Sequence, residues 1–150
     1  MGWMQRKVYK ESAYYIVRNF ILALLSYGNV KGRLVVESAT SEKDFYYHKA
    51  AGLFLSRGIP ELNVSHTKVQ NLLTEISFVS KKNFDIEEQL ADLFSYAGRL
   101  KFQNKAESSL TAYEKNILKL LNTKLFKMDP RTGDKKRKFL SKIESFKILP

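Results

Sequence analysis

The chain has 150 residues, of which 44% are hydrophobic and 13% aromatic, so it is long and apolar enough to form one domain with a packed core. It has no cysteine, which excludes disulfides and thiolate metal sites, and its two histidines lack the spacing of a zinc site. The net charge is +11, with 13 Lys and Arg against 10 Asp and Glu in residues 1–100 but 13 against 5 in residues 101–150. This asymmetry favours a polyanionic partner, either nucleic acid or an anionic membrane surface, although a basic tail that only keeps a protein soluble has the same charge.

A first helix is predicted from about Tyr9 to Tyr27, because apolar residues recur there at three- and four-residue spacing. These residues are Ala13, Ile16, Val17, Phe20, Ile21, Leu24 and Leu25. The most apolar part, residues 13–25, contains Arg18 and Asn19 and is shorter than the roughly 20 residues that cross a bilayer. It also lacks the small-residue cleavage site of a signal peptide. We therefore expect a cytoplasmic protein without a membrane segment.

A strand and a second helix follow. The segment GRLVVES, residues 32–38, is short, β-branched and bounded by glycine, which predicts a buried strand. Ser41 and Asp44 match a capping box, and the helix that they begin is predicted to end near Arg57, just before Gly58.

The second half of the chain predicts one more strand and two more helices. Residues 59–73 give no clear pattern beyond a helical turn in KVQNLL, whereas TEISFVS, residues 74–80, alternates like a strand. Apolar periodicity predicts helices over 86–100 and 110–126. Residues 127–138, with Asp-Pro and Thr-Gly-Asp turn signals and a run of cations, predict a basic loop.

The predicted order is helix, strand, helix, strand, helix, helix. Strands separated by helices favour a parallel sheet, so the expected fold class is α/β, with a small sheet of two or three strands and about four helices. We expect a single domain of residues 1–150. Because so small a sheet exposes its edges, the pattern also indicates missing strands, supplied by a second chain or by another copy of this one.

Glu37 is the first candidate for chemistry. It ends the strand RLVVE just before a turn, and ligand sites in α/β proteins gather at the carboxyl ends of strands. A carboxylate there can hold a hard cation such as Mg²⁺ together with substrate phosphates. A solvent-facing acid at a strand end has the same pattern.

Asp92 is the second candidate, within the helix over 86–100. The apolar side of that helix contains Ile86, Leu90, Leu93, Phe94, Ala97 and Leu100. Asp92 lies away from this side, close to Gln89, Tyr96 and Arg99, so periodicity alone favours a solvated surface acid.

Other features point less clearly to function. Lys81 and Lys82 follow the second strand and could contact phosphates as point charges, or simply keep a turn soluble. The tyrosine pairs at 14–15 and 46–47 could stack on bases, but at helical spacing we favour a place in the core. The chain has no glycine-rich phosphate loop, no nucleophile elbow and no H-E-x-x-H motif, so nothing supports covalent nucleophilic catalysis.

The order of these pieces resembles a known family. A strand ending in an acid, a helix, a strand ending in FVSKK and a helix reading QLADLFSY resemble the C-terminal half of domain of unknown function 3800, a bacterial and phage family similar to ribonuclease H in fold. The resemblance covers about residues 9–149, and QLAD is its most specific part. It implies a partial ribonuclease-H-like fold, a metal-binding carboxylate cluster at the strand ends and nuclease-type phosphoryl transfer with Mg²⁺ or Mn²⁺.

The resemblance also implies roles for individual residues. Asp92 corresponds to the helix carboxylate, with Gln89 as a supporting side chain beside it. Glu37 corresponds to the acid at the end of the fourth strand, so Glu37 and Asp92 are the expected catalytic and metal-binding residues. Lys81 and Lys82 correspond to the basic turn before the last helix.

The chain departs from the family at its start. Family members begin with a strand carrying Asp-Glu-Ser-Gly, which supplies the first carboxylate, whereas GWMQRKVYKES leads straight into a helix here. Because metal chemistry at phosphates needs several oxygen ligands, we expect a chain that is inactive alone, or one half of a split nuclease.

Two other functions are compatible with the sequence. One is a non-catalytic module that binds nucleic acid through basic residues, including Lys135, Lys136, Arg137 and Lys138. The other is an interaction protein that offers its open sheet edge to a partner chain.

Overall fold

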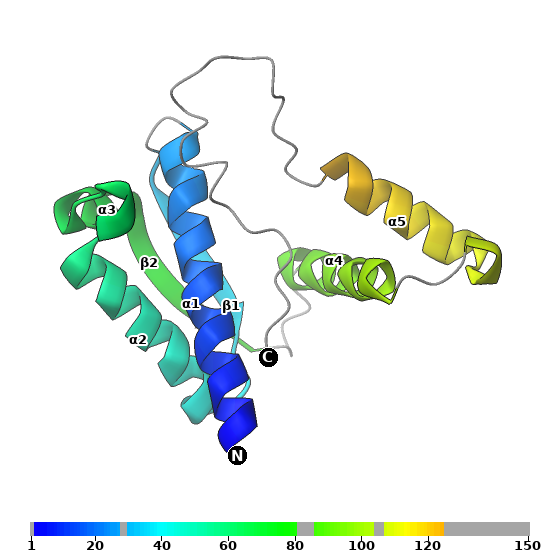
Figure 1. Cartoon of the computed structure of the whole chain (residues 1–150), viewed down its shortest axis with the longest axis horizontal. Helices are drawn as coiled ribbons and strands as arrows, with labels where there is room; N and C mark the ends of the chain where they lie inside the picture. Colours follow the sequence, from blue (N-terminus) through cyan, green and yellow to red (C-terminus); the bar gives the residue numbers. More distant parts are fainter. Residues whose placement is uncertain (1, 28–29, 81–85, 104–106, 125–150) are drawn as a thin grey trace. The chain divides into compact units, whose positions relative to one another are not determined.

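The structure, a computed structural model, describes four segments of the chain, residues 2–27, 30–80, 86–103 and 107–124 (Figure 1). They belong to two compact units, which we call the α/β unit, residues 2–80, and the helical hairpin, residues 86–124. The α/β unit contains α1 (Trp3–Ser26), β1 (Gly32–Glu37), α2 (Ser41–Arg57), η1 (Pro60–Leu62), α3 (His66–Leu72) and β2 (Leu73–Val79). The hairpin contains α4 (Ile86–Phe102), η3 (Glu107–Ser109) and α5 (Ala112–Lys124).

The α/β fold class is therefore confirmed. The described segments contain five α-helices where about four were predicted, and the additional one is α3. None of these helices combines the length and apolarity of a membrane span. The prediction of one domain over residues 1–150 stays a prediction, and the basic loop at 127–138 lies outside the described residues.

β1 and β2 pair in parallel, as the alternation of strands and helices predicts. Val35 lies opposite Ser77, and Glu37 lies opposite Val79, so the carboxyl ends of the two strands are adjacent. The pairing continues one residue further, because the Ser38 N–H donates to the Val79 carbonyl at 2.8 Å.

Helices cover one face of this sheet. Leu34 and Ile76, which are register partners, pack against the core formed with α1 and α2, and both helices lie in front of the strands in Figure 1. Val35 and Glu37 alternate with the core-facing positions and are exposed. The strand predicted at 32–38 is thus confirmed, but its burial is wrong, because successive side chains of a strand point to opposite faces.

The core of the α/β unit is centred on α1. Its most enclosed side chains are Ala13, Val17, Ile21, Leu22, Ile59 and Val69, each without exposed surface. Most of the predicted apolar stripe of α1 is buried, whereas Ile16 is 43% exposed. The helix also begins at Trp3 and not near Tyr9.

A tight connection joins α2 to α3. Gly58 follows α2 with φ +70°, and a Cβ there would collide with the carbonyl oxygen of Val64, so the position requires glycine. Ile59 and Val64 form an antiparallel bridge around η1. Ser65 then caps α3, its hydroxyl accepting a hydrogen bond from the Lys68 N–H at 3.2 Å.

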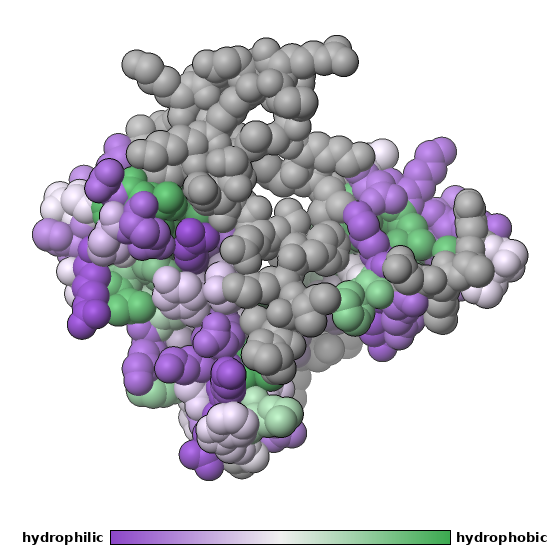
Figure 2. Space-filling model, viewed as in Figure 1, coloured by the Kyte–Doolittle hydropathy of each residue, from purple (hydrophilic) through white to green (hydrophobic). Residues whose placement is uncertain are grey.

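The helical hairpin has a small core. Ala97 of α4 is enclosed between Ile117 and Leu121 of α5, and Tyr96 donates a hydrogen bond to Glu114 at 3.3 Å. Large apolar side chains at Ile86, Leu90, Phe102, Tyr113 and Leu120 stay exposed, and Figure 2 shows hydrophobic patches between polar ones on this part of the molecule. The helices predicted at 86–100 and 110–126 are confirmed, with α4 continuing to Phe102 and α5 beginning at Ala112.

Candidate functional site

The carboxyl end of the sheet is the place where an α/β fold presents ligand-binding groups. Glu37 is the last residue of β1 and its side chain is exposed. It therefore has the strand-end position that the sequence predicts. Its role as a metal ligand or catalytic residue stays a prediction.

The turn after Glu37 is held by the carboxylate of Asp44. The Ser38 hydroxyl donates to Asp44 Oδ2 at 2.6 Å, and the Ala39 N–H donates to Asp44 Oδ1 at 3.2 Å. Both carboxylate oxygens of Asp44 are thus engaged with the turn. Asp44 fixes the strand end against the first turn of α2, which is a structural role.

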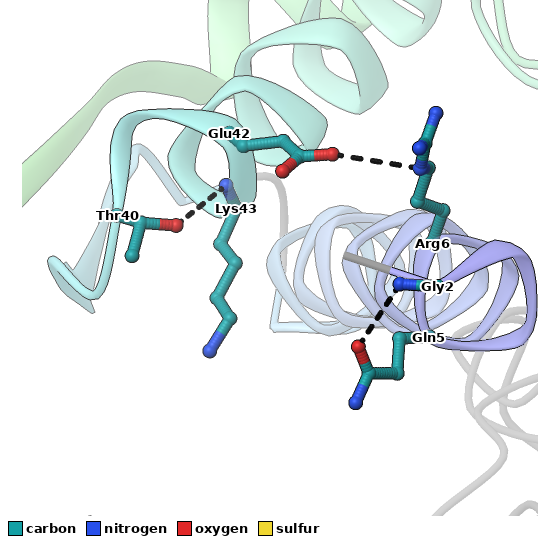
Figure 3. A network of polar contacts seen from close by, with 6 residues as sticks. All are labelled: Gly2, Gln5, Arg6, Thr40, Glu42 and Lys43. Carbon is teal, nitrogen blue, oxygen red and sulfur yellow. Dashed lines mark hydrogen bonds and ion pairs between the residues drawn. The ribbon is translucent and has the colours of Figure 1, made fainter.

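The helix cap in this turn differs from the predicted one. Thr40 is the N-cap of α2, and its hydroxyl accepts a hydrogen bond from the Lys43 N–H at 3.3 Å (Figure 3). The prediction that Ser41 starts a capping box with Asp44 is wrong, because Asp44 bonds back to Ser38 and Ala39. The predicted end at Arg57 is confirmed, and the helix begins at Ser41, one residue earlier than a cap at Ser41 implies.

An ion pair links α1 and α2 near the same end. Arg6 Nε lies 3.8 Å from Glu42 Oε1, and Figure 3 shows the two side chains meeting between the helices. Both side chains are about half exposed, so the pair contributes little to stability.

Asp92 and Gln89 both lie on α4 and are exposed. They are three positions apart, which makes them neighbours on a helix surface. The buried side of the same helix contains Ala97 and Leu100. Asp92 is therefore an exposed surface acid, as the apolar periodicity of the helix alone predicts. Glu37 belongs to the α/β unit and Asp92 to the hairpin. That the two carboxylates share one metal site therefore stays a prediction.

A metal centre needs several ligands close together. In the segments that the structure describes, no three His, Cys, Asp or Glu side chains form a group that could hold a metal ion. Mg²⁺ is often bound by only one or two carboxylates, together with the phosphates of a substrate, so a group of three side chains is not required. The predicted Mg²⁺ or Mn²⁺ site therefore stays a prediction.

Several predicted nucleic-acid contacts lie outside the described residues. They are Lys81, Lys82, Lys135, Lys136, Arg137 and Lys138.

A groove between α1 and α2 is a second candidate site, which the sequence did not reveal. It has a volume of about 440 Å³. It is lined by Lys10, Glu11, Tyr14, Tyr46, Lys49, Ala50, Gly52, Leu53, Ser56 and Arg57. Three of these side chains are cationic and one is acidic. Within the described residues, none of the three cations forms an ion pair with an acid.

Tyr14 contributes a fixed aromatic wall to this groove. Its ring centroid lies 5.0 Å from that of Phe54 and 5.4 Å from that of Tyr15. Burial raises the pKa of the Tyr14 hydroxyl above its ordinary value of 10.0, and the charge of Glu61 raises it further. The hydroxyl is therefore a neutral hydrogen-bond donor at neutral pH.

The sequence contains a weak signal for this groove. Lys49, Leu53 and Ser56 recur at helical spacing on α2, beside the mid-helix residue Gly52, which costs helix stability. The other wall comes from α1, and no local pattern shows which face of α1 meets that side of α2.

The helical hairpin has a groove of its own along α5, with a volume of about 720 Å³. It is lined by Leu110, Lys115, Asn116, Leu118, Lys119, Asn122 and Thr123. Its lining contains two lysines and no acid, so it is also electropositive.

Comparisons with known proteins identified no relative of this chain. No protein-family model matches the chain, and no curated protein or solved structure matches it. The resemblance to domain of unknown function 3800 therefore stays a prediction.

Proposed function

We propose that this chain is a non-catalytic module that binds nucleic acid. The observation that carries the proposal is the charge of its grooves: both the α1–α2 groove and the α5 groove are lined by more cations than acids. The full chain also has more cations than acids, with a net charge of +11. A cytoplasmic location is part of the proposal.

The physical basis is electrostatic. Each phosphate that a Lys or Arg side chain neutralises releases condensed counterions into solution, which drives binding and makes it depend on salt. Lysines and arginines that lack an acidic partner have no ion pair to give up when they contact phosphate. Lys10, Lys49 and Arg57 meet that condition among the described residues.

Fluorescence anisotropy with a labelled oligonucleotide tests the proposal. We expect the logarithm of the binding constant to fall linearly with the logarithm of salt concentration. Changing the groove cations Lys10, Lys49 and Arg57 together to alanine should lower that slope by up to about 2, at about 0.7 for each single-strand phosphate contact. Lys68→Ala, at a cation that lines neither groove, is the matched control.

Two results would contradict this function. One is an affinity that does not change with salt, because counterion release would then be absent. The other is a loss of binding in Asp92→Ala, because removing an acid should leave electrostatic binding intact or slightly stronger.

A second candidate is the one that the family resemblance implies: the C-terminal part of a ribonuclease-H-like domain, completed by another chain. The observation that favours it is the parallel pairing of β1 and β2, with Glu37 at the carboxyl end opposite Val79. Each of these strands has one partner strand among the described residues. The remaining edges are where further strands could pair.

A reconstitution experiment separates this candidate from the first. The partner is a chain that carries an Asp-Glu-Ser-Gly strand, encoded by a neighbouring reading frame. Together with Mg²⁺ or Mn²⁺, the pair should cut nucleic acid, and Glu37→Gln or Asp92→Ala should abolish cutting. Glu75→Gln, at an exposed acid inside β2, should cut normally. An inert mixture, or equal cutting by Asp92→Ala, would rule the nuclease out.

A further inference from the structure

We propose that the α1–α2 groove receives an unpaired nucleobase whose flanking phosphates contact the cations of the groove, so that the module prefers single-stranded nucleic acid. This inference rests on the proposed binding function and specifies its substrate class. It depends on four features of the groove: its size, its aromatic wall, the placement of its charges and the residue Gly52.

Size and lining suit a planar ring. The volume of about 440 Å³ falls in the range of small-molecule pockets, and Ala50 and Leu53 give it an apolar surface. Tyr14 of α1 and Tyr46 of α2 pack against the core, as predicted, but both are only partly buried and also line the groove. Bases of a single strand can leave their stack and lie against such rings, whereas those of a duplex are paired and stacked inside it.

The aromatic wall is organised before a ligand arrives. Phe54 is buried, and its ring holds Tyr14 at a centroid distance of 5.0 Å. A tyrosine that is already fixed loses little conformational entropy when a base stacks on it. Its neutral hydroxyl can still donate a hydrogen bond to the ligand.

The cations are spread along the groove. Lys49 and Arg57 lie eight positions apart on α2, which at 1.5 Å per residue is about 12 Å along the helix axis. Lys10 faces them from α1. This spread fits a chain of phosphates better than one isolated anion. Glu11 is the single acid, and its carboxylate can accept a hydrogen bond from an amino group of a base.

Gly52 provides a way to close the groove without harming the fold. A Cβ built on Gly52 meets no atom within 4 Å, so this position opens onto empty space. Because Gly52 lines the groove, we expect a leucine at this position to reduce the space that is open to a base. Because glycine in a helix interior costs about 1 kcal/mol relative to alanine, Gly52→Leu should fold at least as well as the wild type.

The test compares two strands that differ only in their bases. The full-length chain is titrated into a labelled 20-nucleotide single strand, and into a strand of equal length in which every nucleotide lacks its base. We expect the wild type to bind the normal strand at least about fivefold more tightly, the effect of stacking one base. Gly52→Leu should bind both strands equally, with its thermal unfolding temperature unchanged or higher. Tyr27→Leu, at an exposed tyrosine outside the groove, should keep the preference.

Distinct results would overturn distinct claims. Equal binding of both strands by the wild type would refute the base site but leave the proposed binding function standing. A preference that survives in Gly52→Leu would place the base elsewhere on the protein. If neither strand binds, the proposed function fails together with this inference.

Discussion

The Ser38 hydroxyl at the end of β1 donates a hydrogen bond of 2.6 Å to the carboxylate of Asp44 in the first turn of α2. The same carboxylate accepts from the Ala39 N–H. One acid thus joins a strand end to the helix that follows it, beside the strand-end residue Glu37.

Removing this carboxylate should weaken the fold. We expect Asp44→Ala to lower the free energy of unfolding by about 0.5–1.5 kcal/mol, the net contribution of a typical hydrogen bond, because water can reach the exposed Ser38 hydroxyl and Ala39 N–H. Urea unfolding followed by circular dichroism measures the change. Glu42→Ala, in the same turn but in an exposed ion pair with Arg6, should cost less than about 0.5 kcal/mol. Equal effects of the two changes would contradict the structural role of Asp44.

Gly52 within α2 and Gly58 just after it should respond in opposite ways to alanine. Gly58→Ala should destabilise the protein by more than 1 kcal/mol, on the order expected for alanine at positive φ against a backbone carbonyl. Gly52→Ala should stabilise it by about 0.5–1 kcal/mol, since the position is helical and open. Thermal unfolding of both variants provides the measurement. A stabilised Gly58→Ala protein would contradict the positive φ of Gly58 and its close approach to the Val64 carbonyl.

Two isoleucines of α1 form a matched pair for the core. Ile21 has no exposed surface, so Ile21→Ala should cost about 2–5 kcal/mol through lost burial and the cavity left behind. Ile16 is 43% exposed, so the same change there should cost far less, about 1 kcal/mol or below. Chemical unfolding of the two variants should rank them in this order. The reverse order would mean that α1 presents a different face to the core.

Tyr47 should make stability depend on alkaline pH. Burial raises the pKa of its hydroxyl above 10.0, and the charge of Asp44 raises it further. The unfolded chain loses this proton first, so the free energy of unfolding should fall as pH rises above 10.0 toward the folded pKa. Tyr47→Phe should reduce that fall, measured as urea midpoints between about pH 9 and about pH 11. Identical pH profiles for the two proteins would be inconsistent with a buried hydroxyl.

Local pattern was enough to predict most elements. The end of α2 follows from Gly58, its start was predicted to within one residue, and both strands follow from short β-branched runs. The start of α1 was missed because Trp3 and Met4 are helical but exposed, so they add nothing to the apolar stripe. Helix α3 has seven residues, too few for periodicity to separate it from a turn.

Of the candidate sites, only the features that depend on local sequence could be predicted. Glu37 could be placed at a strand end from sequence, because a strand and its turn are local features. The cap at Thr40 could not be predicted from sequence, because Ser38, Thr40 and Ser41 can all cap a helix. The hydrogen bond between Ser38 and Asp44 engages Ser38, and Thr40 accepts from the Lys43 N–H. The α1–α2 groove needs side chains from two helices that are remote in sequence. The packing of Tyr14 of α1 against Phe54 of α2, within the core that the two helices share, brings its walls together.

The parallel pairing of β1 and β2 has a consequence for protein synthesis. Thr74 donates a hydrogen bond to the Gly32 carbonyl across 42 positions of sequence. At about 5–20 residues per second, β1 is made roughly 2–8 s before the strand that pairs with it. During that interval, packing of the newly made α2 on α1 is the interaction that can shelter the nascent apolar surface. We therefore expect the helix pair to form before the sheet on the ribosome.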